Sequence, residues 1–297
     1  MRSISFGLIT LIFLLQACNN PEENTVEKPI ISVSILPQKY FIEQLAGNEF
    51  VVNVLLPPGN SPASYDPTPR QLRNLSKSEL YLKIGHLGFE LAWMESIKKN
   101  HKDLKIIDLS AGIDLIQGDE EVDGHEEDKP GKRHVHDHGG IDPHIWMSPK
   151  SAVILAENTA NAIIRFDPVC QDLIRQNLAV FIEKINALDQ DLEAISKKLK
   201  NKKFIIFHPA LTYLARDYGL EQIPMEFEGK EPSAAYMKQL IDLAKAENIS
   251  RVFIQKEFDQ AKAQQITKDL NAKLIQIDPL AEDWEGQMRE LIQAFKK

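Results

Sequence analysis

The sequence predicts an α/β protein of two lobes, each with a parallel β-sheet and flanking helices, joined by a long rigid backbone helix. Short apolar runs alternate with helical patterns in both halves of the chain, which is typical of parallel sheets. The longest helical pattern lies between the halves, and the length of 297 residues agrees with about two domains. We expect a first lobe at 29–166, a linking helix at 167–201 and a second lobe at 202–297.

Four apolar runs predict the strands of the first lobe, and helical patterns separate them. The strands are expected at Ile30–Leu36, Val51–Leu56, Leu80–Ile84 and Lys105–Ile107. The helices are expected at Phe41–Ala46, Gln71–Ser76 and Phe89–Lys98. Because a strand, a helix and a second strand make one crossover unit, this order favours a parallel sheet.

The linking helix is predicted from apolar residues that recur at alternating steps of four and three. These residues are Ile174, Leu178, Phe181, Ile185, Leu188, Leu192, Ile195 and Leu199. About 30 residues at about 1.5 Å each would make a rod of roughly 45 Å. The pattern fits a coiled-coil dimer or a spine packed against both lobes, and we favour the spine because the pattern is short for a coiled coil. A stiff helix would limit how far the lobes can hinge.

The second lobe repeats the alternation of the first. Its strands are expected at Phe204–Phe207, Arg251–Ile254 and Lys273–Ile277. Its helices are expected at Thr212–Tyr218, Ala234–Ala246, Gln260–Asn271 and Trp284–Phe295.

Residues 1–17 are predicted to be a signal peptide, because their apolar run is too short to span about 30 Å of hydrocarbon. The run ends in the sequence LQAC at residues 15–18, which resembles the lipobox of bacterial lipoproteins. The resemblance implies that Cys18 is acylated and that the protein is anchored by lipid in the cell envelope, extracytoplasmic or periplasmic. Residues 18–28 are polar and lack apolar periodicity, so we expect a flexible tether. An ordinary secretory signal with an incidental cysteine is the alternative.

Composition and charge exclude some classes of function. The chain has 35 Lys and Arg against 43 Asp and Glu, a net charge of −8, and no basic cluster that would indicate a nucleic-acid binder. Two cysteines cannot build a disulfide framework. Cys170 lies in a helical pattern, so we expect it to be a half-buried, inert thiol.

The segment 117–140 within the first lobe is rich in acids and histidines. It holds eight acidic and three basic side chains, a net charge of −5. Its histidines are His125, His134, His136 and His138. With almost no apolar residue to anchor it, we expect a disordered loop. It is either a solvated charge run or an auxiliary loop that captures divalent transition metal weakly, and we favour metal capture.

Three scattered polar residues stand where predicted elements begin or end. His144 lies just before a helix that Ser148 and Pro149 can start. His208 and Asp278 follow predicted strands, at the carboxyl edge of a parallel sheet, where α/β proteins form ligand sites. Each residue alone fits a cap or a hydrogen-bonded polar group, but together they are a candidate metal site shared between the lobes.

Several motifs resemble, in order, those of the zinc- and manganese-binding lipoproteins of bacterial ABC importers, the cluster 9 solute-binding family. The matching segments are Pro57–Pro69, Asp142–Pro149 (DPHxWxSP), Pro168–Asn177, His208–Gly219, Gly229–Ser233 and Ile277–Leu280. The resemblance implies two α/β lobes on a rigid helix and one metal held between them. By residue-level match it implies His144, His208 and Asp278 as metal ligands. It also implies a monomer that delivers its metal to an ABC transporter membrane permease, and not an enzyme.

The chain departs from the family at the first metal ligand. The family carries a histidine in a PHxYEPTP stretch, and here residues 62–69 read PASYDPTP, so Ala63 offers no donor atom. His86 follows the predicted strand Leu80–Ile84 and would lie at the same sheet edge. Our hypothesis is that His86 supplies the missing nitrogen; a surface histidine, or a site completed by water or Asp66, is the alternative.

The ligand types favour Zn²⁺ over Mn²⁺, because three imidazoles and one carboxylate suit tetrahedral zinc whereas manganese prefers oxygen donors. A zinc hydrolase is a weaker alternative, since the sequence contains no HExxH or GxSxG motif. The sequence neither supports nor excludes a surface adhesin.

Overall fold

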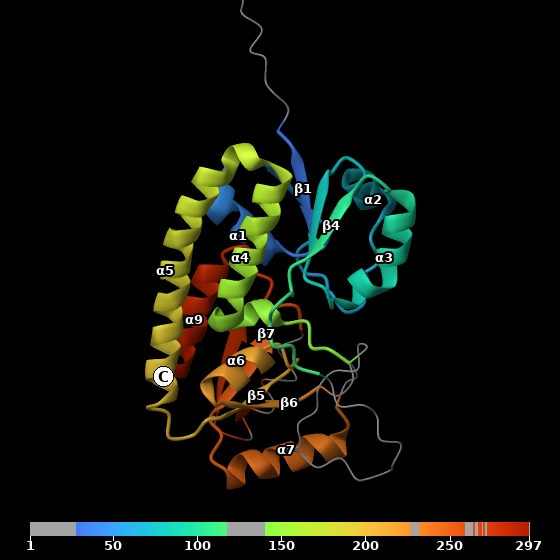
Figure 1. Ribbon diagram of the computed structural model, residues 1–297. Helices are drawn as coiled ribbons and strands as arrows, with labels where there is room; N and C mark the ends of the chain where they lie inside the picture. Colours follow the sequence, from blue (N-terminus) through green and yellow to red (C-terminus); the bar gives the residue numbers. More distant parts are fainter. Residues whose placement is uncertain are drawn as a thin grey trace, which may run out of the picture.

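The computed structural model describes residues 28–117, 140–226, 232–258 and 272–296, together with residues 264, 267, 268 and 270. Within these residues the chain forms two α/β lobes, one above the other beside a pair of long helices (Figure 1). Each lobe holds a four-stranded parallel sheet, which confirms the predicted fold class. No helix in this part of the chain combines the length and the apolar composition that crossing a membrane requires.

The first sheet has the strand order β2-β1-β3-β4. Its strands are β1 (Ile30–Val33), β2 (Val51–Val54), β3 (Leu80–Lys83) and β4 (Lys105–Asp108). Its helices are α1 (Leu36–Ala46), α2 (Pro69–Leu75) and α3 (Gly88–Asn100). All neighbouring strands are parallel, so their amino ends share one edge of the sheet and their carboxyl ends the other. We name these the amino edge and the carboxyl edge.

The second sheet has the strand order β6-β5-β7-β8 and is also parallel throughout. Its strands are β5 (Lys203–Ile206), β6 (Glu221–Pro224), β7 (Arg251–Gln255) and β8 (Lys273–Ile277). Its helices are α6 (Thr212–Tyr218), α7 (Ala234–Ala246) and α9 (Trp284–Lys296). Alternate side chains of β5 reach opposite faces: Phe204 packs with Phe295 of α9, and Ile205 packs in the cluster under α7.

Two helices form the spine between the lobes, α4 (Pro149–Phe166) and α5 (Gln171–Ser196). The 26 residues of α5 give a rod of roughly 39 Å. Its buried stripe follows the predicted pattern: Ile174, Phe181, Ile185, Leu188, Leu192 and Ile195. Because α5 packs on α1 of the first lobe and on α9 of the second, the spine interpretation is confirmed.

Aromatic rings join the two lobes across the spine. Phe181 of α5 lies 5.0 Å from Phe41 of α1 and 6.4 Å from Trp284 of α9, between ring centroids. One continuous apolar core therefore runs from the first sheet through α5 to the second sheet. A wide hinge motion would expose these rings, at about 1.5–3 kcal/mol for each large side chain.

Some predicted elements differ from the structure. Strand β6 has no counterpart in the prediction, because Glu221–Pro224 is a short, partly polar segment at the sheet edge, where a proline is tolerated. Helix α5 ends at Ser196, although the amide of Leu199 still donates to the carbonyl of Ile195. The helix predicted at Gln260–Asn271 falls mostly outside the described residues. Cys170 is partly buried, and burial raises the pKa of its thiol, in agreement with the expected inert group.

Candidate metal centre

Trp146 connects two of the three segments that carry the predicted ligands. Its indole Nε1 donates a hydrogen bond of 2.7 Å to the carbonyl of Pro279, and its own carbonyl accepts one of 2.8 Å from the indole of Trp284. Both indoles are buried. The indole of Trp146, two residues after His144, is thereby bonded to the backbone of Pro279, one residue after Asp278. The two residues are 133 positions apart in the sequence.

Tyr213 connects the third segment, which begins at His208. Its hydroxyl donates to the carbonyl of Asp142 (2.8 Å) and accepts from the amide of Ile116 (3.2 Å). Tyr213 is buried in the first turn of α6, which starts four residues after His208. The segments around His144, His208 and Asp278 therefore meet in one place.

His144 is oriented by the carboxylate of Asp142, which lies two residues before it. One oxygen of Asp142, Oδ1, accepts from the backbone amide of His144 (2.8 Å) and lies 2.9 Å from its ring Nδ1. Both side chains are buried. A carboxylate on Nδ1 makes Nε2 the metal-binding nitrogen and fixes the direction of the ring.

His208 lies against His144 and has a carboxylate partner of its own. The two imidazole centroids are 5.3 Å apart, with the ring planes at 73°. Nδ1 of His208 lies 3.3 Å from Oε2 of Glu226, a buried side chain just after β6. Both imidazoles therefore carry a carboxylate on Nδ1.

The backbone of His208 is held by Gln255, the last residue of β7. The amide oxygen of Gln255 accepts from the backbone N–H of His208 (3.2 Å), and its Nε2 donates to the carbonyl of the same residue. Gln255 is completely buried. Since β5 and β7 are neighbours in the sheet, this pair of bonds fixes where the chain leaves β5.

Burial lowers the pKa of His208 below its ordinary value. The hydrogen bond with Glu226 opposes this effect, and the neighbouring His144 adds to it. The neutral imidazole, which is the form that binds metal, is therefore favoured at neutral pH.

Asp278 lies directly after β8. Its neighbour Pro279 is bonded to Trp146, but the Asp278 side chain contacts other residues than His144 and His208. Its Oδ1 accepts from the amide of Leu280 (3.2 Å), and its Oδ2 lies 3.6 Å from Nζ of Lys256. Among the described residues, no three His, Cys, Asp or Glu side chains come close enough to hold a metal together. The structure thus brings His144 and His208 into contact, whereas the side chain of Asp278 contacts Leu280 and Lys256.

His86 lies in the turn after β3, at the carboxyl edge of the first sheet, beside the segment of Ala63. The amide of Phe89 donates to the carbonyl of Pro62 (3.1 Å), and a Cβ at Gly88 would collide with the carbonyl oxygen of Ala63. Burial lowers the pKa of the His86 imidazole, while Asp108 raises it. The described contacts do not join His86 to His144 or His208, so its role as a ligand stays a prediction.

The buried carboxylate of Glu90 accepts hydrogen bonds from the turn that carries His86. This carboxylate is 1% exposed and accepts from the amides of Ile84 (2.8 Å) and Gly85 (2.7 Å) and from the hydroxyl of Ser34. Gly85 has φ of +117°, and a Cβ there would lie 2.7 Å from Oδ1 of Asp108, so only glycine fits. The sequence therefore builds a rigid turn under His86.

Several predicted residues lie outside the described part of the chain. They are Cys18 with the signal peptide, and the loop histidines His125, His134, His136 and His138. Most of the segment Gly229–Ser233 also lies outside it.

Sequence reasoning missed Glu226 and Gln255 as parts of the site. Their contacts with His208 span 18 and 47 positions, and neither residue stands in a recognisable spacing. Asp142 was visible as part of the DPH motif, but its bond to His144 could not be inferred from the motif alone. A buried polar residue at the end of a predicted strand was the one available signal.

Two parallel α/β lobes on a rigid helix, with the imidazoles of His144 and His208 paired where the segments meet, form the arrangement that the resemblance implied. The chain belongs to the family of ZnuA, the periplasmic component A of the zinc-uptake complex, whose model matches residues 31–297. This is a family of binding components and not of enzymes, which removes the hydrolase alternative.

Similar proteins extend over nearly the whole chain. The zinc-binding lipoprotein AdcA of Streptococcus pneumoniae is 28% identical over 286 residues, which are 94% of this chain but 56% of AdcA. The high-affinity zinc uptake system protein ZnuA of Bacillus subtilis is 28% identical over 277 residues, 90% of this chain and 85% of its own. A crystal structure of ZnuA has a TM-score of 0.79 and 38% identity, covering 90% of this chain and 97% of that one. The chain thus spans little more than half the length of AdcA.

Proposed function

We propose that the protein is an extracytoplasmic zinc-binding protein that captures Zn²⁺ between its lobes and delivers it to an ABC transporter permease for uptake. The observation that carries this proposal is the pair of imidazoles of His144 and His208, 5.3 Å apart, each with a carboxylate on Nδ1. Such carboxylate–histidine pairs orient the ring and raise its basicity toward a metal.

The proposed ligands are His144, His208, Asp278 and His86. The imidazoles of the first two lie 5.3 Å apart between centroids, and Trp146, two residues after His144, donates to the carbonyl of Pro279, next to Asp278. His86 stands beside Ala63, where the family's first histidine would be. Closing the site needs Asp278 to exchange Lys256 for the metal and His86 to approach from the first lobe.

Zinc is proposed over manganese because the ligand set is mainly nitrogen. The names of AdcA and of the Bacillus protein specify zinc, which supports the same choice. Weak capture by the loop histidines His125, His134, His136 and His138 would raise the local zinc concentration near the site.

Delivery requires that the permease can distinguish the loaded protein from the empty one. Since one apolar core runs through both lobes, we propose a small movement of Asp278 and of the His86 turn instead of a wide hinge closure. We further propose that the protein is a monomer, anchored in the cell envelope through acylated Cys18.

Zinc affinity, measured by competition with a chromophoric chelator at constant pH, tests the proposal. His208→Ala should weaken binding by more than about 100-fold, because loss of a ligand exceeds the effect of losing its carboxylate partner. His101→Ala is the matched control, since His101 lies at the end of α3, at the amino edge, and should bind zinc like the unaltered protein. Equal affinities of the two variants would refute the site.

A further inference from the structure

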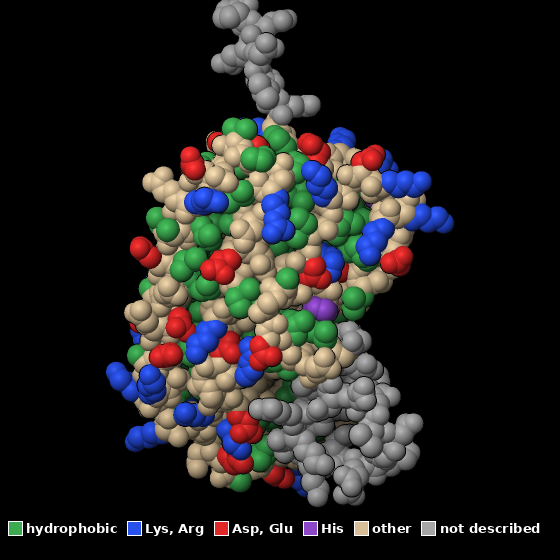
Figure 2. Space-filling model, in the orientation of Figure 1, with side chains coloured by type: hydrophobic (Ala, Val, Ile, Leu, Met, Phe, Trp, Pro, Cys, Tyr) green, Lys and Arg blue, Asp and Glu red, His purple; other side chains and the backbone are tan. Residues whose placement is uncertain are grey.

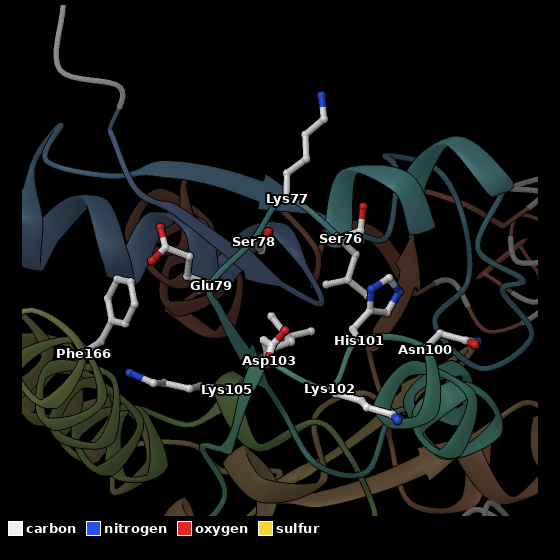
Figure 3. A pocket seen from close by; sticks show the side chains of 12 residues that line it. Ser76, Lys77, Ser78, Glu79, Asn100, His101, Lys102, Asp103, Lys105 and Phe166 are labelled. Atoms are coloured by element: carbon white, nitrogen blue, oxygen red, sulfur yellow. The ribbon is translucent and has the colours of Figure 1, made fainter.

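The amino edge of the first sheet, which lies opposite the carboxyl edge with His86, is hollowed and carries lysines. A hollow of about 530 Å³ lies between the ends of α2 and α3 and the starts of β3 and β4 (Figure 3). Lys77, Lys102 and Lys105 line it, together with Glu79 and Asp103. None of these three lysines forms an ion pair within the described residues. The hollow thus holds three lysines against two carboxylates, in a chain of net charge −8. Asp167 and Glu49 lie near Cys170, beside Val169.

Exposed apolar side chains stand at the same edge. Val169, at the turn between α4 and α5, is 94% exposed; Val51, at the start of β2, is 49% exposed; and Leu173 is 40% exposed. Phe166 connects this group to the hollow. Its ring lies 6.2 Å from that of Phe50, the residue before Val51, and under the ammonium of Lys105, which lines the hollow. Figure 2 shows hydrophobic, basic and acidic side chains together at the end of the molecule where β1 begins.

The chain enters the fold at this edge. Lys28, directly before β1, donates to the carbonyl of Asn48, three residues before Val51. The ten residue-to-residue steps from Cys18 to Lys28 can span at most about 36 Å. If Cys18 is acylated, as the proposed function has it, this edge stays within that reach of the bilayer. The other end of the roughly 39 Å rod of α5 is turned away from it.

We propose that the amino edge docks on a membrane surface with anionic lipid headgroups. Lys77, Lys102 and Lys105 bind the headgroup phosphates, and Val169 and Leu173 enter the interface between headgroups and acyl chains. Basic and apolar side chains on one surface are the combination that anionic membranes attract. Docking in this pose turns the carboxyl edge, with His86 and Ala63, away from the lipid, so the proposed zinc site stays open to solvent.

A tryptophan at position 169 reports the contact directly. The experiment uses the chain from residue 19, which contains every described residue, and vesicles of phosphatidylcholine with or without phosphatidylglycerol. The tryptophan emission of Val169→Trp should shift to the blue with vesicles that contain phosphatidylglycerol and not with vesicles of phosphatidylcholine only. Leu91→Trp is the control, because Leu91 is 50% exposed in the first turn of α3, near the carboxyl edge, and should not shift. A shift in both variants or in neither would overturn the proposal.

Two triple variants that remove positive charge test the role of the lysines. Replacing Lys77, Lys102 and Lys105 by Gln should weaken partition onto the phosphatidylglycerol vesicles about fivefold per lysine, on the order of 100-fold in all. The same change at Lys197, Lys198 and Lys200, exposed residues beyond the far end of α5, should leave it unchanged. Equal losses would mean unspecific attraction, and binding of inorganic phosphate without vesicle partition would mean a free-anion site; either result overturns the proposal. Zinc affinity, measured on the same samples, should be unchanged, which separates this surface from the zinc site.

Discussion

The two sides of the proposed zinc site are built to different degrees. On one side, His208 is fixed by Gln255 through its backbone and by Glu226 through its ring, and it already touches His144. On the other side, the first lobe offers Ala63 where its family has a histidine, and His86 on a neighbouring turn. Under the proposed function, zinc affinity would begin with the pair of His144 and His208, and the turn of His86 would close the site.

The bond between Trp146 and Pro279 connects the segments of His144 and Asp278, and its loss should have the largest effect on stability. Trp146→Ala removes a completely buried indole and its bond to Pro279, and should lower the free energy of unfolding by about 3–5 kcal/mol. Denaturant unfolding of the metal-free protein measures it. Trp93→Ala, at a partly exposed indole, should cost about 1 kcal/mol or less. A loss below about 1 kcal/mol for Trp146→Ala would show that this bond does not organise the two segments.

The first-lobe side is tested at His86. His86→Ala should weaken zinc binding by more than about 100-fold if the imidazole is a ligand, and a loss below about tenfold would reject it. Ala63→His in the His86→Ala background sharpens the comparison, because it returns a nitrogen donor to the family position. That double variant should regain most of the lost affinity.

Glu226 tests the support of the side that carries His208. Glu226→Ala should weaken zinc binding about 10- to 100-fold, because the His208 ring loses the carboxylate that orients it. Glu226→Gln should lose less, since the amide oxygen can still accept from Nδ1. Glu282→Ala is the control, because Glu282 is exposed and pairs with Lys39 on the surface. If Glu226→Ala bound zinc as tightly as this control, Glu226 would have no part in the site.

The dependence of zinc affinity on pH should be the mildest effect. Zinc competes with protons for the imidazoles, so affinity falls as pH drops below about 6.5. Because burial lowers the pKa of His208 and of His86, affinity should stay nearly constant from about pH 8 to 7 and decline only below that ordinary value. Chelator competition across this range measures it, and a decline that begins near pH 8 would contradict neutral, buried imidazoles.

The sequence predicted the two sheets and the spine because both depend on local periodicity. It placed α6, α7 and β8 at the residues where they occur. It could not predict β6, whose polar residues form a strand only through pairing with β5.

The candidate ligands could be chosen only where a motif carried them, and their role as ligands stays a prediction. His144, His208 and Asp278 could be chosen because they stand in family motifs next to element ends. Glu226 and Gln255 could not, because their contacts with His208 exist only after distant segments have packed. For the same reason, the sequence could not show that Asp278 bonds to Leu280 and pairs with Lys256.

Anomalous scattering from crystals of the zinc-loaded protein, recorded at the zinc absorption edge, tests the central proposal most directly. The account predicts one strong peak about 2.0–2.1 Å from Nε2 of both His144 and His208, with Asp278 and His86 completing a tetrahedron. A peak that contacts neither of these two imidazoles would contradict it.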